Sequence, residues 1–336
     1  MSDKTFRIAL VGCGRISKNH VEAIDRVDGL SLVAACDEDA ERARALAEPR
    51  GIPWFTSYEE MLEKVQCEVV AICTPSGLHP AQGVLAAKTG HHVVTEKPMA
   101  ISLRGADELV AACDAAKVNL FVVKQNRLNA PVQLLKRAVD RGRFGRIYLA
   151  NCTVRWTRPQ EYYEQAPWRG TWEFDGGAFM NQASHYIDLI QWIVGPVENV
   201  MAKTATLARK IETEDTGVAI LRFRSGALGV IEVDRRQPDV GAILTPVVGN
   251  LADRTVGRDL VRIDAAGSGA LGTSDCQNAD EGNAHGILRC TRCAGDNWQS
   301  QRSYATVAIV QIAVAVPSTR YGLKAQSASA ASIVAS

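Results

Sequence analysis

The feature that most constrains the fold is an apolar strand that runs directly into a glycine turn and then a helix. Phe6–Val11 leads into Gly12-Cys-Gly14-Arg-Ile-Ser17, and a helical stretch follows over residues 16–27. A second apolar strand, Leu30–Cys36, ends at Asp37. Gly12 permits the tight turn, and Gly14 lets the backbone approach a pyrophosphate at the helix N-terminus. The segment predicts a βαβ unit that binds a dinucleotide.

Asp37 indicates which dinucleotide the unit prefers. It falls 20 residues after Ser17, where a carboxylate accepts hydrogen bonds from the ribose hydroxyls and repels a 2′-phosphate. We therefore expect NAD and not NADP. Ser17 replaces the third glycine of the fingerprint, so helix and strand should pack slightly less closely. Taken alone, the glycine loop is also compatible with an ordinary turn between strand and helix.

The alternation of strands and helices continues to about residue 123. Helical patterns cover residues 58–64, 79–88 and 102–117, and strands are expected at 68–73, 91–95 and 119–123. We interpret residues 1–123 as a doubly wound parallel sheet, an α/β Rossmann domain. The loops after its strand ends are where a cofactor and a substrate would meet.

Two of those loops carry reactive side chains. Thr74-Pro75-Ser76-Gly-Leu-His79 follows one strand, and Glu96-Lys97-Pro98 follows the next. A lysine held beside a nicotinamide ring can stabilise a developing alkoxide or transfer its proton. The alternative is a solvated Glu–Lys pair in a surface loop.

A later motif allows the chain to be compared with a known family. Residues 176–188 read Gly-Gly-Ala-Phe-Met-Asn-Gln-Ala-Ser-His-Tyr-Ile-Asp. With the glycine fingerprint and Glu96-Lys97-Pro98, this resembles the Gfo/Idh/MocA oxidoreductases, whose helix motif is Gly-Gly-x-x-x-Asp-x-x-x-His. The resemblance implies a second, α+β domain at residues 124–234 with an open, mostly antiparallel sheet. It also implies a cis peptide before Pro98.

The same resemblance implies the residues of the site. Lys97 and His185 become the catalytic pair. The expected contacts to NAD are Gly12, Gly14, Arg15, Ile16, Asp37, Thr74, Pro75, Ser76, His79, Glu96, Lys97 and Gln125.

Three further segments, residues 122–127, 156–163 and 168–177, are similar to one branch of the family, the UDP-N-acetyl-2-amino-2-deoxyglucuronate dehydrogenases. This implies oxidation of the 3-hydroxyl of UDP-N-acetylglucosaminuronic acid to a 3-keto sugar for lipopolysaccharide biosynthesis, with 2-oxoglutarate as a reoxidant of NADH. A polyol or simple-sugar dehydrogenase and an inactive NAD-binding remnant are the alternatives. The expected substrate contacts are Lys124, Asn126, Arg127, Arg158, Tyr162, Trp168, Arg169, Asn181 and Gln182.

The chemistry of the pair follows from its residue types. Asn181 and His185 are four apart, so on one helix they would share a face and point into one cleft with Lys97. Neutral His185 is suited to accept the hydroxyl proton while Lys97 holds the oxygen, and the roles can be exchanged. Asn181 adds no charge where the family has Asp, so His185 should be less basic. A histidine on such a helix is also compatible with a plain core role.

The composition bears on the partners of the protein and on the compartment in which it works. The net charge of +1 argues against nucleic-acid and membrane partners. Nine cysteines, several of them inside apolar runs, are typical of reduced thiols in a cytoplasmic protein. The expectation is a cytoplasmic enzyme without a metal. The family resemblance implies a homo-oligomer that forms through the second sheet if that sheet is intact.

The chain changes character after about residue 235. Residues 1–235 contain 10 Lys and 17 Glu, whereas residues 236–336 contain only Lys324 and Glu281. We recognise no clear strand pattern there and expect the second sheet to be incomplete. Our hypothesis is that residues 235–336 are an atypical segment, frame-shifted or disordered; a divergent insertion and tail is the alternative. Incidental cysteines explain the zinc-like pattern Cys276, His285, Cys290 and Cys293 as well as a metal site does.

Overall fold

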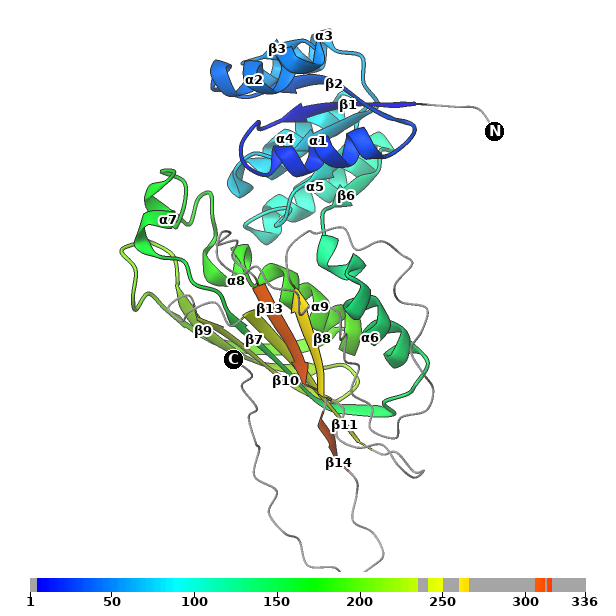
Figure 1. Cartoon of the computed structure of the whole chain (residues 1–336), viewed down its shortest axis with the longest axis vertical. Coiled ribbons are helices and arrows are strands. Elements are labelled where there is room, and N and C mark those ends of the chain that lie inside the picture. The colour runs from blue at the N-terminus through cyan, green and yellow to red at the C-terminus, as the bar shows by residue number, and fades with distance from the viewer. Residues whose placement is uncertain (1–4, 235–240, 250–259, 266–305, 312, 316–336) are drawn as a thin grey trace, which may run out of the picture.

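The first domain is a six-stranded parallel sheet, as its apolar runs predict. The computed structural model describes residues 5–234, 241–249, 260–265, 306–311 and 313–315 of the chain (Figure 1). The strand order is β3-β2-β1-β4-β5-β6, so the order reverses between β1 and β4, where such sheets bind ligands. The strands are β1 Phe6–Val11, β2 Leu30–Cys36, β3 Trp54–Phe55, β4 Val69–Ile72, β5 His92–Thr95 and β6 Leu120–Val122.

Helices cover both faces of this sheet. Successive side chains of a strand point to opposite faces. Ile8 and Leu10 accordingly belong to one buried cluster, and Ala9 and Val11 to another. The α-helices are α1 Ser17–Arg26, α2 Ala40–Ala47, α3 Tyr58–Lys64, α4 His79–Lys88 and α5 Leu103–Ala116. Short 3-10 helices span Glu48–Arg50, Ser76–Leu78 and Gln125–Leu128.

The second domain is built on a separate, mixed sheet. Its order is β12-β13-β11-β7-β10-β9-β8, with β14 paired to β11. Both parallel pairs, such as β7 with β10, and antiparallel pairs, such as β9 with β10, occur. The strands are β7 Arg146–Arg155, β8 Val197–Ala205, β9 Thr216–Phe223, β10 Leu228–Asp234, β11 Gly241–Gly249, β12 Leu260–Ala265, β13 Thr306–Gln311 and β14 Ala313–Ala315.

One face of the second sheet carries the core of this domain. On β9, Leu221 and Phe223 are buried while Val218 and Ile220 are exposed, the alternation of a sheet covered on one side. The helices of the domain are α6 Ala130–Asp140, α7 Gln160–Glu164, α8 Gly177–Asn181 and α9 Ser184–Val194. Residues of α6 and α9 pack into this core. Figure 1 shows the two domains stacked, with α8 on the side that faces the first domain.

The predicted fold class, a Rossmann domain followed by a domain with an open sheet, is confirmed. The tail differs from expectation, because four strands, β11 to β14, lie after residue 240. Runs such as residues 307–310 are apolar throughout and do not alternate, so the sequence pattern does not separate them from buried helix or coil. The zinc-like pattern of residues 276–293 lies outside the described residues. Within the described ranges, no helix is long and apolar enough to cross a membrane.

Candidate active site

In the glycine turn after β1, Gly12 is in close contact with the backbone of the sheet, whereas Gly14 has free space beside it. Gly12 has φ +92°, and a Cβ added there would lie 2.6 Å from the backbone of Cys73 and Thr74. A Cβ added to Gly14 would meet no atom within 4 Å. Ser17, in place of a third glycine, is buried and its hydroxyl donates to the Gly14 carbonyl oxygen at 2.6 Å. The turn therefore leaves room for a pyrophosphate at the start of α1.

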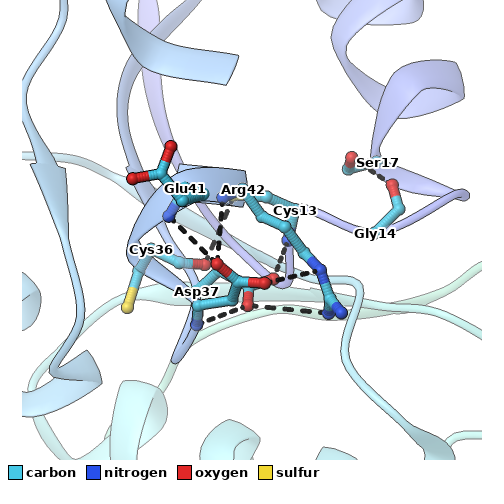
Figure 2. Close-up of polar contacts among 8 residues, drawn as sticks. Cys13, Gly14, Ser17, Cys36, Asp37, Glu41 and Arg42 are labelled. Carbon is cyan, nitrogen blue, oxygen red and sulfur yellow. Dashed lines mark hydrogen bonds and ion pairs between the residues drawn. The ribbon is translucent and has the colours of Figure 1, made fainter. Parts of the chain in front are cut away.

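Asp37 is fixed at the end of β2 and faces this turn (Figure 2). Its Oδ2 accepts from the backbone N–H of Cys13 at 2.7 Å, and its Oδ1 accepts from the N–H of Asp39 at 3.0 Å. The Arg42 guanidinium lies 4.0 Å from Oδ1. A carboxylate held this way retains lone pairs for the hydroxyls of a ribose. The turn and Asp37 together fit an NAD molecule.

The other expected cofactor contacts surround the ends of β4 and β5. Thr74 and Pro75 begin the loop after β4, and the Thr74 hydroxyl donates to Gln82 Oε1 at 2.6 Å. Ser76 is buried, whereas Arg15 and Gln125 are exposed and Ile16 packs against the core.

His79 has both ring nitrogens within hydrogen-bond distance of carbonyl oxygens of the protein. It is 1% exposed, with Nδ1 2.8 Å from the Pro98 carbonyl oxygen and Nε2 2.8 Å from the Thr74 carbonyl oxygen. Both polar atoms of the ring are thereby engaged within the protein. His79 ties the loop after β4 to the loop after β5, and its expected contact to NAD stays a prediction.

Glu96 is also turned inward. Its Oε1 lies 2.9 Å from His20 Nε2, and its Oε2 accepts from the backbone N–H of Lys97 at 3.1 Å. Burial raises the pKa of Glu96, but the bonds from His20 and from the Lys97 backbone outweigh it and leave the pKa below its usual value. The carboxylate is therefore ionised beside Lys97.

Lys97 reaches from the first domain into the second. The Lys97–Pro98 peptide is cis, as the family resemblance implies. The ammonium Nζ donates to the Asn181 carbonyl oxygen at 3.0 Å. Burial lowers the pKa of Lys97 to about 8, and the charges of Glu96 and Asp175 oppose that change. The side chain can thus both hold and release a proton near neutral pH.

His185 lies in the first turn of α9, next to Lys97. It is buried, and its Nδ1 has no hydrogen-bond partner among the described residues. Burial and the positive charges of Lys97 and Lys124 lower the pKa of His185 to about 3. The ring is therefore neutral at physiological pH, with one nitrogen as a donor and the other as an acceptor.

Asn181 and His185 do not share one continuous helix, which corrects the expectation from their spacing. Asn181 ends α8, and α9 begins at Ser184. In an uninterrupted helix the Asn181 carbonyl would accept from the N–H four residues later. Here it accepts from Lys97 Nζ and, at 3.1 Å, from the Ser184 hydroxyl. The interruption turns this carbonyl toward the other domain.

The expected substrate residues fall into two groups. One is a stack in which the Arg158 guanidinium lies over the rings of both Trp156 and Tyr162, at 4.3 and 4.8 Å from their centroids. The Arg169 guanidinium lies 4.2 Å from the Tyr162 centroid and 4.6 Å from that of Trp168. We call these five residues the arginine–aromatic stack. The positive charge of Arg158 is also one of the causes that lower the pKa of Lys97.

The second group lies at the junction of the domains. Lys124 Nζ approaches the Ser184 carbonyl oxygen at 3.5 Å. Arg127 is turned away, because its guanidinium makes two 2.7 Å hydrogen bonds to the Asp188 carboxylate and lies over the Trp192 ring. This bidentate pair occupies the fork that we expected to meet substrate. Asn126 is partly buried beside it and Gln182 is buried.

Three residues of this region were not expected from the sequence. His20 pairs with Glu96, Asp188 pairs with Arg127, and Asp175 hydrogen-bonds the Asn181 side chain. Asp175 stands directly before the two glycines of the family motif, which is the only local signal that marks it. Among the residues that the structure describes, no group of three or more His, Cys, Asp or Glu is placed to hold a metal ion.

Two family models match the chain. Residues 6–124 match an oxidoreductase family with an NAD-binding Rossmann fold, and residues 132–249 match the GFO/IDH/MocA C-terminal domain. Myo-inositol 2-dehydrogenase of Thermotoga maritima is 31% identical over 69% of this chain and 69% of its own length. These matches confirm the predicted family and the predicted NAD cofactor.

Solved structures with higher identity also match. The WlbA dehydrogenase from Bordetella pertussis, in complex with NADH and UDP-GlcNAcA, is 55% identical. It covers 70% of this chain and 72% of its own, with a TM-score of 0.69. The WlbA dehydrogenase from Chromobacterium violaceum, also with NADH and UDP-GlcNAcA, is 54% identical over 70% and 69%, with a TM-score of 0.69.

Proposed function

The chain belongs to the Gfo/Idh/MocA family of NAD-dependent oxidoreductases acting on CH–OH groups, and we propose that its substrate is UDP-N-acetylglucosaminuronic acid, oxidised at the 3-hydroxyl. The product would be the 3-keto sugar used in lipopolysaccharide biosynthesis. The observation that carries the proposal is the arginine–aromatic stack beside Lys97. The 55% identity to a dehydrogenase solved with UDP-GlcNAcA supports it.

The chemistry of the stack suits a nucleotide-linked sugar acid. Such a ligand carries a diphosphate and a carboxylate, which guanidinium groups bind with paired hydrogen bonds. Aromatic rings can stack on uracil or cover a sugar. The buried Trp156 Nε1 and Arg169 Nε have no hydrogen-bond partner among the described residues, so both are donors that a polar ligand would satisfy. A neutral polyol has no anionic group for these arginines.

Lys97 and His185 divide the proton chemistry between them. NAD⁺ bound at the glycine turn would take hydride from the sugar carbon. Lys97 has a pKa of about 8 and is matched to accept the hydroxyl proton, whereas His185, with a pKa of about 3, is a weak base. His185 would orient the hydroxyl by accepting or donating a hydrogen bond. We therefore assign the role of base to Lys97, the exchanged form of our first expectation.

Substrate choice tests this proposal directly. We expect the full-length protein to reduce NAD⁺ with UDP-N-acetylglucosaminuronic acid, and at least roughly tenfold more slowly with UDP-N-acetylglucosamine, which lacks the carboxylate. Myo-inositol should give no NADH. Turnover of myo-inositol without turnover of the UDP-sugars would contradict the proposal and support a polyol dehydrogenase. NAD binding without turnover of any of the three would indicate an inactive remnant.

Variants separate chemistry from binding. Lys97→Ala and His185→Ala should each lower turnover roughly a hundredfold or more, while NAD binding, measured by calorimetry, persists. Arg158→Gln should mainly raise KM for the UDP-sugar acid. Arg222→Gln, which removes an arginine paired with Glu198 on the second sheet, is the matched control and should leave both constants unchanged. An unchanged KM in Arg158→Gln would remove the stack from the substrate site.

A further inference from the structure

Asp175 is a buried carboxylate that the chemistry above does not use. It is 0% exposed and lies between α7 and α8. Its Oδ2 accepts from the Gly170 backbone N–H at 2.8 Å, and its Oδ1 accepts from the Asn181 side-chain amide. Within the described part of the chain, no Lys, Arg or His nitrogen forms an ion pair with it. Burying a carboxylate without an ion-pair partner is costly, so its presence calls for a role.

Asn181 connects this carboxylate to Lys97. Its side-chain amide donates to Asp175, and its backbone carbonyl accepts from Lys97 Nζ at 3.0 Å. The residue itself carries no charge. Asn181 links the two charged residues: its carbonyl bonds Lys97, and its side-chain amide bonds the Asp175 carboxylate.

Asp175 differs from the other charged groups that act on Lys97 in its own hydrogen-bond partners. Glu96, Asp175, Lys124 and Arg158 all act on the Lys97 ammonium, and His185 lies beside it. The two cations disfavour a charged lysine. Glu96 is already held by His20 at 2.9 Å. Asp175 is thus the carboxylate near Lys97 that has no direct cationic partner of its own.

We propose that Asp175 is a positioning residue for the reaction, which holds Lys97 through Asn181 and supplies the negative charge that keeps this lysine a competent base. The inference rests on the proposed function, because it takes Lys97 as the group that accepts the hydroxyl proton. Asp175 itself does not touch the reacting atoms in this arrangement.

The test removes the charge and keeps the shape. In Asp175→Asn, the new amide can still accept from Gly170 N–H and bond Asn181 after the Asn181 amide rotates. Loss of the carboxylate should lower the pKa of Lys97. The acidic limb of the kcat/KM profile, which in the wild type rises with pH through about 8, should therefore move to lower pH by roughly one pH unit. The rate at the alkaline plateau should fall several-fold, because a less basic lysine accepts a proton less readily.

A charge exchange provides the rescue. Asp175→Asn combined with Asn181→Asp restores a carboxylate within the same pair of side chains. We expect the acidic limb to return to the wild-type position within about half a pH unit. Glu214→Gln is the matched control, since Glu214 is a buried carboxylate that holds the N–H of Phe179 on α8 and does not act on Lys97. Glu214→Gln should leave the acidic limb of the kcat/KM profile at the wild-type pH, even if this variant is less stable.

A measurement without turnover separates this inference from the proposed function. The pKa of Lys97 can be followed by NMR of ¹³C-labelled lysine in the NAD-bound full chain, with the resonance assigned by its loss in Lys97→Arg. A pKa that is lower in folded Asp175→Asn than in the wild type supports the inference even when no UDP-sugar is oxidised. An equal pKa in the two overturns it. If Asp175→Asn does not fold, Asp175→Ser decides, because its hydroxyl can bond the Asn181 amide and carries no charge; a Lys97 pKa equal to that of the wild type in this variant contradicts the coupling.

Discussion

Gly12 and Gly14 differ in what an added methyl group would meet, and this difference separates folding from cofactor binding. Gly12→Ala places a Cβ 2.6 Å from two backbone atoms at a positive φ, so the free energy of unfolding should fall by at least about 2 kcal/mol. Gly14→Ala meets no protein atom within 4 Å and should fold normally. It should bind NAD roughly tenfold or more weakly, because its methyl group projects into the pyrophosphate space.

Thermal unfolding and calorimetric NAD titration of the two variants check this. Each variant serves as the other's control. Unweakened NAD binding by Gly14→Ala would place the dinucleotide away from the glycine turn.

Individual site residues were predictable where a local motif names them. Gly12, Asp37 and Lys97 each follow a strand end in a recognisable pattern, and the structure brings them to one edge of the first sheet. Arg127 could not be placed, because its partner Asp188 lies 61 residues away and only the fold brings the two together. Asp175 could not be predicted for a similar reason. Its proposed role depends on the Asn181 carbonyl, which bonds Lys97 only because the helix is interrupted between α8 and α9.

At the scale of elements, His79 is the connection between the two loops that carry the proposed site. It joins the Thr74 and Pro98 carbonyls, one on each loop. Burial lowers the pKa of His79, so its neutral ring has one N–H and donates to one of the two carbonyls. His79→Leu should cost about 1 to 3 kcal/mol for the carbonyl that loses this donor. It should also lower kcat at least roughly tenfold, because the loop that holds Lys97 loses its support.

The comparison for this variant is His91→Leu, at the opposite end of β5. His91 is also buried and its ring bonds Thr89. Chemical denaturation should show a loss of stability in both variants, and steady-state kinetics should show a loss of kcat in His79→Leu alone. Equal kcat values would mean that His79 supports the fold and not the site.

Elements with a strong period were predictable, and those shaped by contacts between domains were not. The expected helices at 58–64 and 79–88 coincide with α3 and α4, since a Ser57 cap begins the first and Gly90, at φ +87°, follows the second. The break between α8 and α9 has no such mark. It coincides with the carbonyl that Lys97 binds from the other domain, a contact that no local pattern contains.

At the scale of the whole molecule, the resemblance to the family does not extend through the chain. Neither family model passes residue 249, and Lys and Glu nearly disappear after residue 235. We propose that the coding frame changes near residue 235. Translating the coding DNA beyond that point in its other two frames should yield a sequence that continues the similarity to the WlbA dehydrogenases. If neither frame does so, the segment is a divergent extension and the proposal is wrong.

Several properties of the molecule stay predictions. These are the cytoplasmic location, reoxidation of NADH by 2-oxoglutarate and association of copies through the second sheet. The outer face of β8 and β9 exposes Met201 and Ile220, which are 73% and 57% accessible, and such apolar surface favours a partner.

The central claim is that hydride passes from C3 of a UDP-linked sugar acid to NAD⁺ at the Lys97–His185 pair. The most direct measurement uses UDP-N-acetylglucosaminuronic acid labelled with deuterium at C3 and mass spectrometry of the NADH formed. We expect deuterium in the NADH from the wild type, and Lys97→Ala should form labelled NADH roughly a hundredfold or more slowly. Unlabelled NADH, or labelled NADH formed equally well by Lys97→Ala, would contradict this claim.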